Sequence, residues 1–239
     1  MTLTRFQAFV TVAVFGWFST ALADSDLCSS AAFRTAFMEG QGGFDWPSMG
    51  RRLVGFGDAA VPCLDAIARD EAEGFGITEC KTNPRGCRSW AILALSTIGT
   101  PEAKRVLLEF LEHTTDPVEI TEVIGGLTSL HVREARPAIR RRLKHGSPYV
   151  RAHAILALGQ FGDVRDVDAM IVATLSLPRN NLSEAMGGLE LTGDPRVVGT
   201  LEELAKKFPD PIMHDEITRT IERIRAGKAL RPEVKGENR

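Results

Sequence analysis

The sequence has no excess of positive charge, and this limits the kinds of partner that the protein can have. Its 239 residues carry 29 Lys and Arg against 31 Asp and Glu, a formal net charge of −2. A general nucleic-acid binder needs a broad basic surface to neutralise phosphates, so we expect no nucleic-acid partner. With 44% apolar and 25% charged residues, the composition is that of a globular protein of one or two domains.

Sequence motifs that carry catalysis are also missing. Five histidines are present, but none has the H-E-x-x-H spacing of a zinc enzyme. No G-x-S-x-G motif occurs, and the glycine clusters at 40–43 and 55–57 lack the Lys-Ser/Thr of a phosphate-binding loop. His113 and His145 end predicted helices, where a positive charge suits the helix C-terminus. We therefore expect no enzyme activity, no catalytic residues and no cofactor.

Cysteine is scarce and confined to the first third of the chain after the N-terminal segment. The four cysteines are Cys28, Cys63, Cys80 and Cys87. Neither a C-x-x-C pair nor a histidine cluster accompanies them, so we expect no metal site. In an oxidising compartment they predict two disulfides, with three possible pairings. Because the intervening KTNPRG favours a turn, we prefer Cys80–Cys87, which leaves Cys28–Cys63.

The longest uncharged run lies at the N-terminus. After Arg5 the chain carries no charge until Asp24, and the run closes with Ala21-Leu22-Ala23, a pattern that signal peptidase can accept. We expect residues 1–23 to be a cleaved signal peptide. The mature protein would then be periplasmic or secreted, with a net charge of −3 and no stable membrane insertion. The alternative is an uncleaved anchor, since about 18 uncharged residues approach the length of a membrane span.

A repeat runs through the rest of the sequence. The phrase LALGQFGD at Gly162 recurs as LALSTIGT at Gly99 and LELTGD at Gly193, with His131 at the equivalent place in GLTSLHV. These positions are 32, 31 and 31 residues apart, and an apolar run follows each of them. Each unit therefore predicts a helical hairpin, in which helix A ends near this position and helix B follows. Because neither helix buries its apolar face alone, neighbouring hairpins should stack.

Two columns of residues recur at the same place in each unit. A leucine lies four residues before each turn position, and the residue before that leucine is always small, namely Ala94, Gly126, Ala157 or Gly188. Glycine inside a helix costs about 1 kcal/mol relative to alanine. We interpret the small column as the place where helices cross closely.

The clearest of these phrases, VRAHAILALGQFGDVRDVDAMI and RSWAILALSTIGTPEAKRVLLEFL, resemble the HEAT-like repeats first recognised in phycobilisome lyases. The resemblance covers roughly residues 47 to 226 and is strongest in 87–205. It implies an all-α solenoid of about five stacked hairpins that binds other proteins, but it does not imply lyase chemistry. We expect an N-terminal capping segment at 24–46, the solenoid at 47–226 and a flexible tail at 227–239.

The third unit carries a run of basic residues, HVREARPAIRRRLKH. At 100° per residue, four of them lie in one stripe about 80° wide. They are Arg133, Arg136, Arg140 and Lys144. We expect this stripe to bind a protein partner on the concave helix-B face, where arginines can pair with an acidic segment of that partner. Alternatively, these side chains are solvated or pair with acids of adjacent units. The candidate acids are Glu109, Glu112 and Asp166.

Four aromatic side chains precede the repeats. Phe33, Phe37, Phe44 and Trp46 either cap the apolar end of the first repeat, which we favour, or form a contact site. Taken as a whole, the sequence predicts a non-catalytic protein-binding scaffold or adaptor of the periplasm or extracellular space. The alternatives are a binder of a small ligand or polyanion through the basic stripe and, less favoured, an enzyme or enzyme subunit.

Overall fold

The computed structural model describes residues 27–39 and 52–227, and every regular element in these ranges is a helix. The N-terminal end contains α2 (Ala31–Glu39), α4 (Val61–Ala68) and α5 (Thr78–Thr82), with the 3-10 turn η1 (Gly57–Ala60) before α4. The A helices are α6 (Pro84–Ile98), α8 (Pro117–Ser129), α10 (Pro148–Phe161), α12 (Leu182–Thr192) and α14 (Pro211–Arg225). The B helices are α7 (Pro101–His113), α9 (Arg136–Arg142), α11 (Val167–Leu175) and α13 (Val197–Lys207). Short 3-10 turns, η2 (Arg133–Ala135) and η3 (Val164–Asp166), precede α9 and α11.

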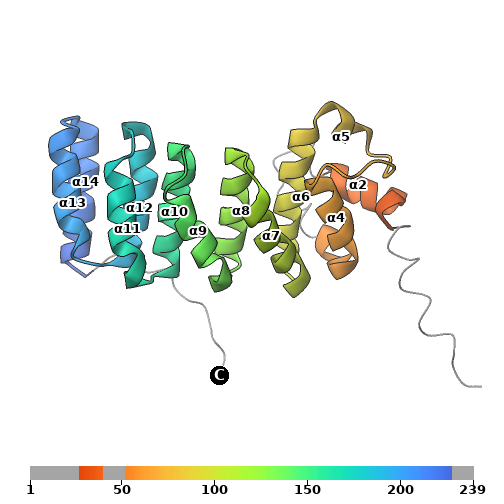
Figure 1. Cartoon of the computed structure of the whole chain (residues 1–239), viewed down its shortest axis with the longest axis horizontal. Coiled ribbons are helices and arrows are strands. Elements are labelled where there is room, and N and C mark those ends of the chain that lie inside the picture. The colour runs from red at the N-terminus through yellow and green to blue at the C-terminus, as the bar shows by residue number, and fades with distance from the viewer. Residues whose placement is uncertain (1–26, 40–51, 228–239) are drawn as a thin grey trace, which may run out of the picture.

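The hairpins follow one another along a single axis, from α4 at one end to α14 at the other (Figure 1). The A helices stack in sequence: α6 packs on α8, α8 on α10, α10 on α12 and α12 on α14. Helices α7, α11 and α13 each pack against the A helix on either side of them in the chain, while α9 packs on α10. The leucine column is buried between the helices, with Leu95, Leu127, Leu158 and Leu189 at most 1% exposed. The predicted all-α solenoid of HEAT-like hairpins is confirmed.

The turn after each of these A helices, from α6 to α12, contains a residue in the left-handed conformation. Gly99, Gly162 and Gly193 directly follow their helices, with φ of 62°, 68° and 60°. In the third unit His131 adopts the same conformation, with φ of 52°. The left-handed region is costly for a residue that carries a Cβ atom. The third unit, which lacks the turn glycine, therefore forms the same turn with a strained backbone at His131.

The small column lies where A helices cross, as predicted. A Cβ atom on Gly188 of α12 would stand 2.5 Å from the carbonyl oxygen of Ile155, and one on Gly126 would stand 2.0 Å from a serine hydroxyl of α6. The neighbouring Gly187 faces away, because a Cβ there would meet nothing closer than 3.8 Å. Gly159 of α10, which the column does not include, completes the contact: its Cβ would stand 2.1 Å from the carbonyl oxygen of Gly188.

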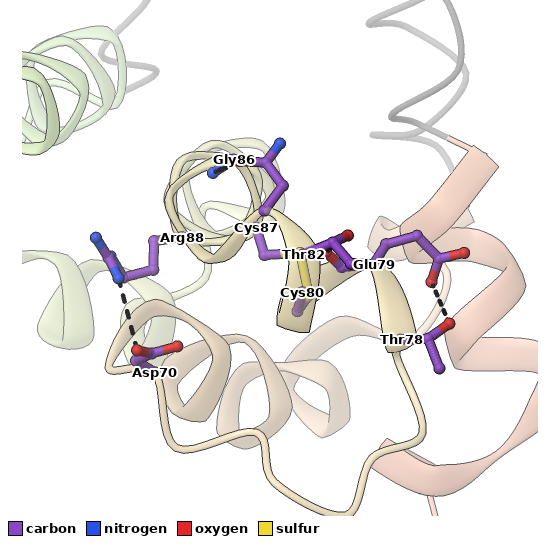
Figure 2. Close-up of a disulfide and its surroundings, with 9 residues drawn as sticks. Asp70, Thr78, Glu79, Cys80, Thr82, Gly86, Cys87 and Arg88 are labelled. Carbon is purple, nitrogen blue, oxygen red and sulfur yellow. Dashed lines mark hydrogen bonds and ion pairs between the residues drawn. A yellow bond between two sulfur atoms is a disulfide. The ribbon is translucent and has the colours of Figure 1, made fainter.

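Two disulfides tie the N-terminal end together. Cys28 bonds to Cys63 in α4, and Cys80 bonds to Cys87, which is the pairing that the sequence favours. Figure 2 shows the second bond, which holds the short helix α5 against the start of α6. Both bonds therefore lie at the N-terminal end of the solenoid, earlier in the chain than the basic run.

Helix α2 adds aromatic side chains to this end of the core. Phe33 and Phe37 are fully buried, and Phe33 lies edge-on to Phe56 with ring centroids 6.2 Å apart. Phe44 and Trp46 fall outside the described residues, as do the expected signal peptide and nearly all of the expected tail. Within the described ranges, the structure contains no helix with the length and apolar character needed to cross a bilayer.

Candidate partner-binding surface

The predicted basic stripe is spread over three pieces of backbone. Arg133 belongs to η2, Arg136 and Arg140 belong to α9, and Lys144 lies in the turn that follows, because α9 is only seven residues long. Arg136 is partly buried, and the other three residues are exposed. The opposite side of α9 packs into the core through Ile139. The four residues therefore lie outside the core without sharing one helix.

Arg136 is held by acids of the following hairpin. Its Nε lies 2.5 Å from Oδ2 of Asp166, and its Nη1 lies 2.5 Å from Oδ2 of Asp163. Asp166 is fully buried, and its Oδ1 forms an ion pair at 3.4 Å with Arg140 Nε that lacks hydrogen-bond geometry. Hydrogen bonds from Arg165 and the charge of Arg136 hold the pKa of Asp163 well below its usual value. Pairing with Asp166, the alternative considered from the sequence, is what the structure shows for Arg136 and Arg140.

The other basic side chains of α9 turn toward α7. Arg141 Nη2 lies 2.5 Å from Glu112 Oε2, while Arg142 donates hydrogen bonds to two main-chain carbonyl oxygens at the end of α7, at 2.5 and 3.3 Å. For the side chains of Arg133 and Lys144, no hydrogen bond or ion pair is found with any described residue. Lys144 is thus a free cation among arginines that join hairpins.

Ion pairs between hairpins recur at about the repeat spacing. Arg88 Nε lies 2.7 Å from Oε1 of the buried Glu119, 31 residues later. Arg223 of α14 makes two hydrogen bonds, of 2.6 and 2.7 Å, to the buried Glu190 of α12. Arg88 is also directed toward Asp70, at 3.7 Å (Figure 2). An arginine in this repeat is therefore commonly a link between units, and the unlinked cations are the first candidates for binding.

An open groove lies between α9 and α11 and has a volume of about 1360 Å³. Helix α11 packs on α13, whereas α9, the shortest of the four B helices, makes no comparable contact with α11. The apolar lining consists of Pro137, Leu143, Ala169, Val172 and Ala173. The cationic lining consists of Arg136, Arg140, Arg141, Lys144, Arg151 and Arg165. Arg133 does not line the groove, so the structure brings together three of the four predicted residues.

Sequence reasoning missed Arg151, Arg165 and Val172, which belong to the next unit. Arg151 and Arg165 do not belong to a run of basic residues, so charge patterning does not single them out. The repeat does hold a signal for Arg165: it lies two residues after Asp163, and the same D-x-R pattern recurs at 194–196. Helix periodicity alone could not place Val172 at a groove, since that position depends on how far α9 stands from α11.

His145 lines the same groove, three residues beyond the end of α9, in surroundings that disfavour its cationic form. Its Nδ1 accepts a hydrogen bond from the backbone N–H of Ser147 at 3.1 Å. Burial, followed by the charges of Arg142 and Arg151, lowers the pKa of His145 below its usual value of 6.5. This corrects the expectation of a positive charge at the end of helix B. His113, in contrast, is the last residue of α7, as expected.

A histidine also takes part in the contacts between hairpins. His153 Nδ1 of α10 lies 3.0 Å from Glu184 Oε2 of α12, and burial raises the pKa of that glutamate. Within residues 27–39 and 52–227, no three His, Cys, Asp or Glu side chains are grouped so that they could hold a metal ion.

Two comparisons with protein families agree with this geometry. Residues 121–180 match the HEAT repeats family, and residues 88–113 match the PBS lyase HEAT-like repeat. The two ranges cover α6, α7, α8, α9, α10 and α11 in whole or in part, and α9 and α11 are the helices on either side of the groove. No curated protein matches the sequence. The stacked hairpins, their left-handed turns and both family matches make this chain a HEAT-like repeat protein.

Proposed function

We propose that this protein is a non-catalytic scaffold or adaptor that binds other proteins through its B-helix face. HEAT repeats generally suit this role, because stacked units present a long surface on a continuous core. The observation that carries the proposal is the open groove between α9 and α11, which combines apolar and charged side chains on one surface. Such a combination is typical of protein interfaces.

We further propose that the protein works in the periplasm or outside the cell. Both cysteine pairs form disulfides, and disulfides persist mainly in oxidising compartments. The uncharged run and small residues of the first 23 positions support export. Cell fractionation with N-terminal sequencing tests this: the mature chain should begin at Asp24 and contain no free thiol. A cytoplasmic chain with reactive thiols would contradict export.

Affinity capture tests the scaffold role. The oxidised wild-type protein is immobilised and exposed to an envelope extract of its own host, and each captured protein is then purified. Isothermal titration calorimetry should show saturable binding of at least one of them to the wild-type protein. If no purified candidate binds, the scaffold role is wrong. Release of a chemically altered product from the complex would contradict a non-catalytic role.

A further inference from the structure

We propose that the groove between α9 and α11 binds a short extended segment of the partner protein in which acidic and apolar side chains alternate. This inference deepens the proposed function and rests on it. It names the chemistry of the segment that the groove would recognise, and the argument comes from charge, exposed apolar surface and the different character of the two walls.

The groove carries more positive than negative charge. Six cations line it, but only three acids are paired with any of them. These acids are Asp163, Asp166 and Glu112. The single acid of the lining, Asp168, is paired with Arg196 at 2.8 Å. The six cations and their paired acids therefore carry a net charge of +3, on a chain whose net charge is −2. A ligand with carboxylates would offset this charge.

Two of the groove cations have no acidic partner among the described residues. Lys144 is exposed and makes no hydrogen bond or ion pair with any of them. Arg151 Nη1 donates to the main-chain carbonyl oxygens of His145 and Gly146, at 2.8 and 3.1 Å, while its Nε is buried without an acceptor. Main-chain carbonyls do not cancel a full positive charge. An anion in the groove would therefore be stabilised by electrostatic attraction to both Lys144 and Arg151.

The apolar lining favours a peptide over a bare polyanion. Val172 is 70% exposed, although burial of its isopropyl side chain would be favourable. It lines the groove together with Ala169 and Ala173 of the same helix. A chain of phosphates or sulfates has no apolar group to place there. The volume of about 1360 Å³ also exceeds the roughly 300–1,000 Å³ of small-ligand pockets.

The two walls differ, and this sets the pattern of the segment. The α9 side supplies four cations, Arg136, Arg140, Arg141 and Lys144, beside the apolar Pro137 and Leu143. On the α11 side, Ala169, Val172 and Ala173 outnumber the one cation, Arg165, which lies just before the helix. An extended peptide places successive side chains on opposite faces. Alternation of acidic and apolar residues would therefore direct carboxylates to the α9 wall and apolar side chains to the α11 wall.

Fluorescence anisotropy with defined peptides tests the proposal on the full, oxidised protein. The probe is a labelled eight-residue peptide that alternates Glu and Val. In the comparison peptide, every Val is replaced by Ser. The Glu–Val peptide should bind at least about fivefold more tightly, because only it can cover Val172. Val172→Ser should remove this difference between the two peptides.

Two substitutions with the same change of charge isolate the electrostatic part. Lys144→Glu should weaken binding of the Glu–Val peptide about tenfold. Lys206→Glu is the matched control: Lys206 is exposed on α13, lines no part of the groove and has no partner among the described residues. It should leave affinity unchanged, and circular dichroism should show both variants folded.

Several outcomes would overturn the proposal. They are no binding of the Glu–Val peptide, equal affinity for both peptides, or equal effects of Lys144→Glu and Lys206→Glu. Tighter binding of an eight-nucleotide oligothymidylate would identify a polyanion site instead. If a captured partner binds the Lys144→Glu and Val172→Ser variants as well as the wild type, the scaffold role stands and the groove proposal fails. If the peptide binds as expected but no partner is captured, the groove stands and the scaffold role fails.

Discussion

At the scale of single residues, the turn after α8 is held by a histidine where the other units use glycine. His131 has a φ of 52°, a conformation that costs a residue with a Cβ about 1–2 kcal/mol. Replacement by glycine relieves this strain but adds conformational freedom to the unfolded chain. We therefore predict that His131→Gly raises the free energy of unfolding by about 0.5–1 kcal/mol in urea denaturation.

Gly162 provides the control for this substitution. It has a φ of 68°, and a Cβ atom there would meet nothing within 4 Å, so only backbone strain is at stake. Gly162→Ala should lower the free energy of unfolding by about 1 kcal/mol. A His131→Gly protein less stable than wild type would show that the imidazole contributes more than its strained backbone costs.

A second prediction at this scale concerns the pH dependence of stability. The folded state lowers the pKa of His145 through burial and the nearby arginines, so the unfolded chain binds a proton more readily. The stability that neutral His145 contributes is present above pH 6.5 and is lost as pH falls through 6.5 toward the folded pKa. His145→Gln stays neutral and can still accept from the Ser147 N–H. We expect the variant to lose less stability than wild type between pH 7 and 5 in urea titrations, and equal losses would contradict the assignment.

At the scale of elements, the close crossing of α10 and α12 depends on glycine. A Cβ on Gly188 would stand 2.5 to 2.7 Å from backbone atoms of α10, which cannot move aside as a flexible side chain can. Gly188→Ala should therefore lower the free energy of unfolding by about 1–3 kcal/mol. Gly187→Ala, one residue earlier in the same helix, should raise it by up to about 1 kcal/mol, because its Cβ makes only an ordinary contact at 3.8 Å. Thermal unfolding of both variants checks this, and similar effects would refute the crossing.

At the scale of the whole molecule, each repeat contacts mainly its neighbours. A loss of stability at one end should therefore not spread to the other end. The bond between Cys28 and Cys63 closes a separation of 35 residues, and that between Cys80 and Cys87 closes one of 7. By chain entropy the two are worth about 4 and 2.5 kcal/mol. We predict that Cys28→Ser with Cys63→Ser speeds hydrogen exchange in α2 and α4 but not in α13 and α14.

The paired serine variant of Cys80 and Cys87 is the control, and its effect on exchange should be smaller and confined to α5 and α6. Uniform acceleration throughout the chain in the Cys28 and Cys63 variant would mean that the solenoid unfolds as one unit. Mass spectrometry of peptide fragments after exchange distinguishes these results.

The sequence by itself determined the features that depend on local pattern. The repeat spacing predicted the hairpins, and the small column predicted the crossing at Gly126 and Gly188. The short turn-forming segment between Cys80 and Cys87 predicted that disulfide. In each case the information lies within one unit or in the comparison of aligned units, where helix period, turn chemistry and side-chain size act directly on the backbone.

Only the tertiary structure decided what the basic run does. Arg136 and Arg140 carry the same charge as Lys144, yet the first two meet Asp166 of the next hairpin and Lys144 meets no described partner. Gly159 and the groove were likewise absent from the sequence analysis. These features depend on groups about 30 residues apart and on the separation of α9 from α11. Neither residue type nor periodicity encodes that separation, because it results from the packing of all the hairpins together.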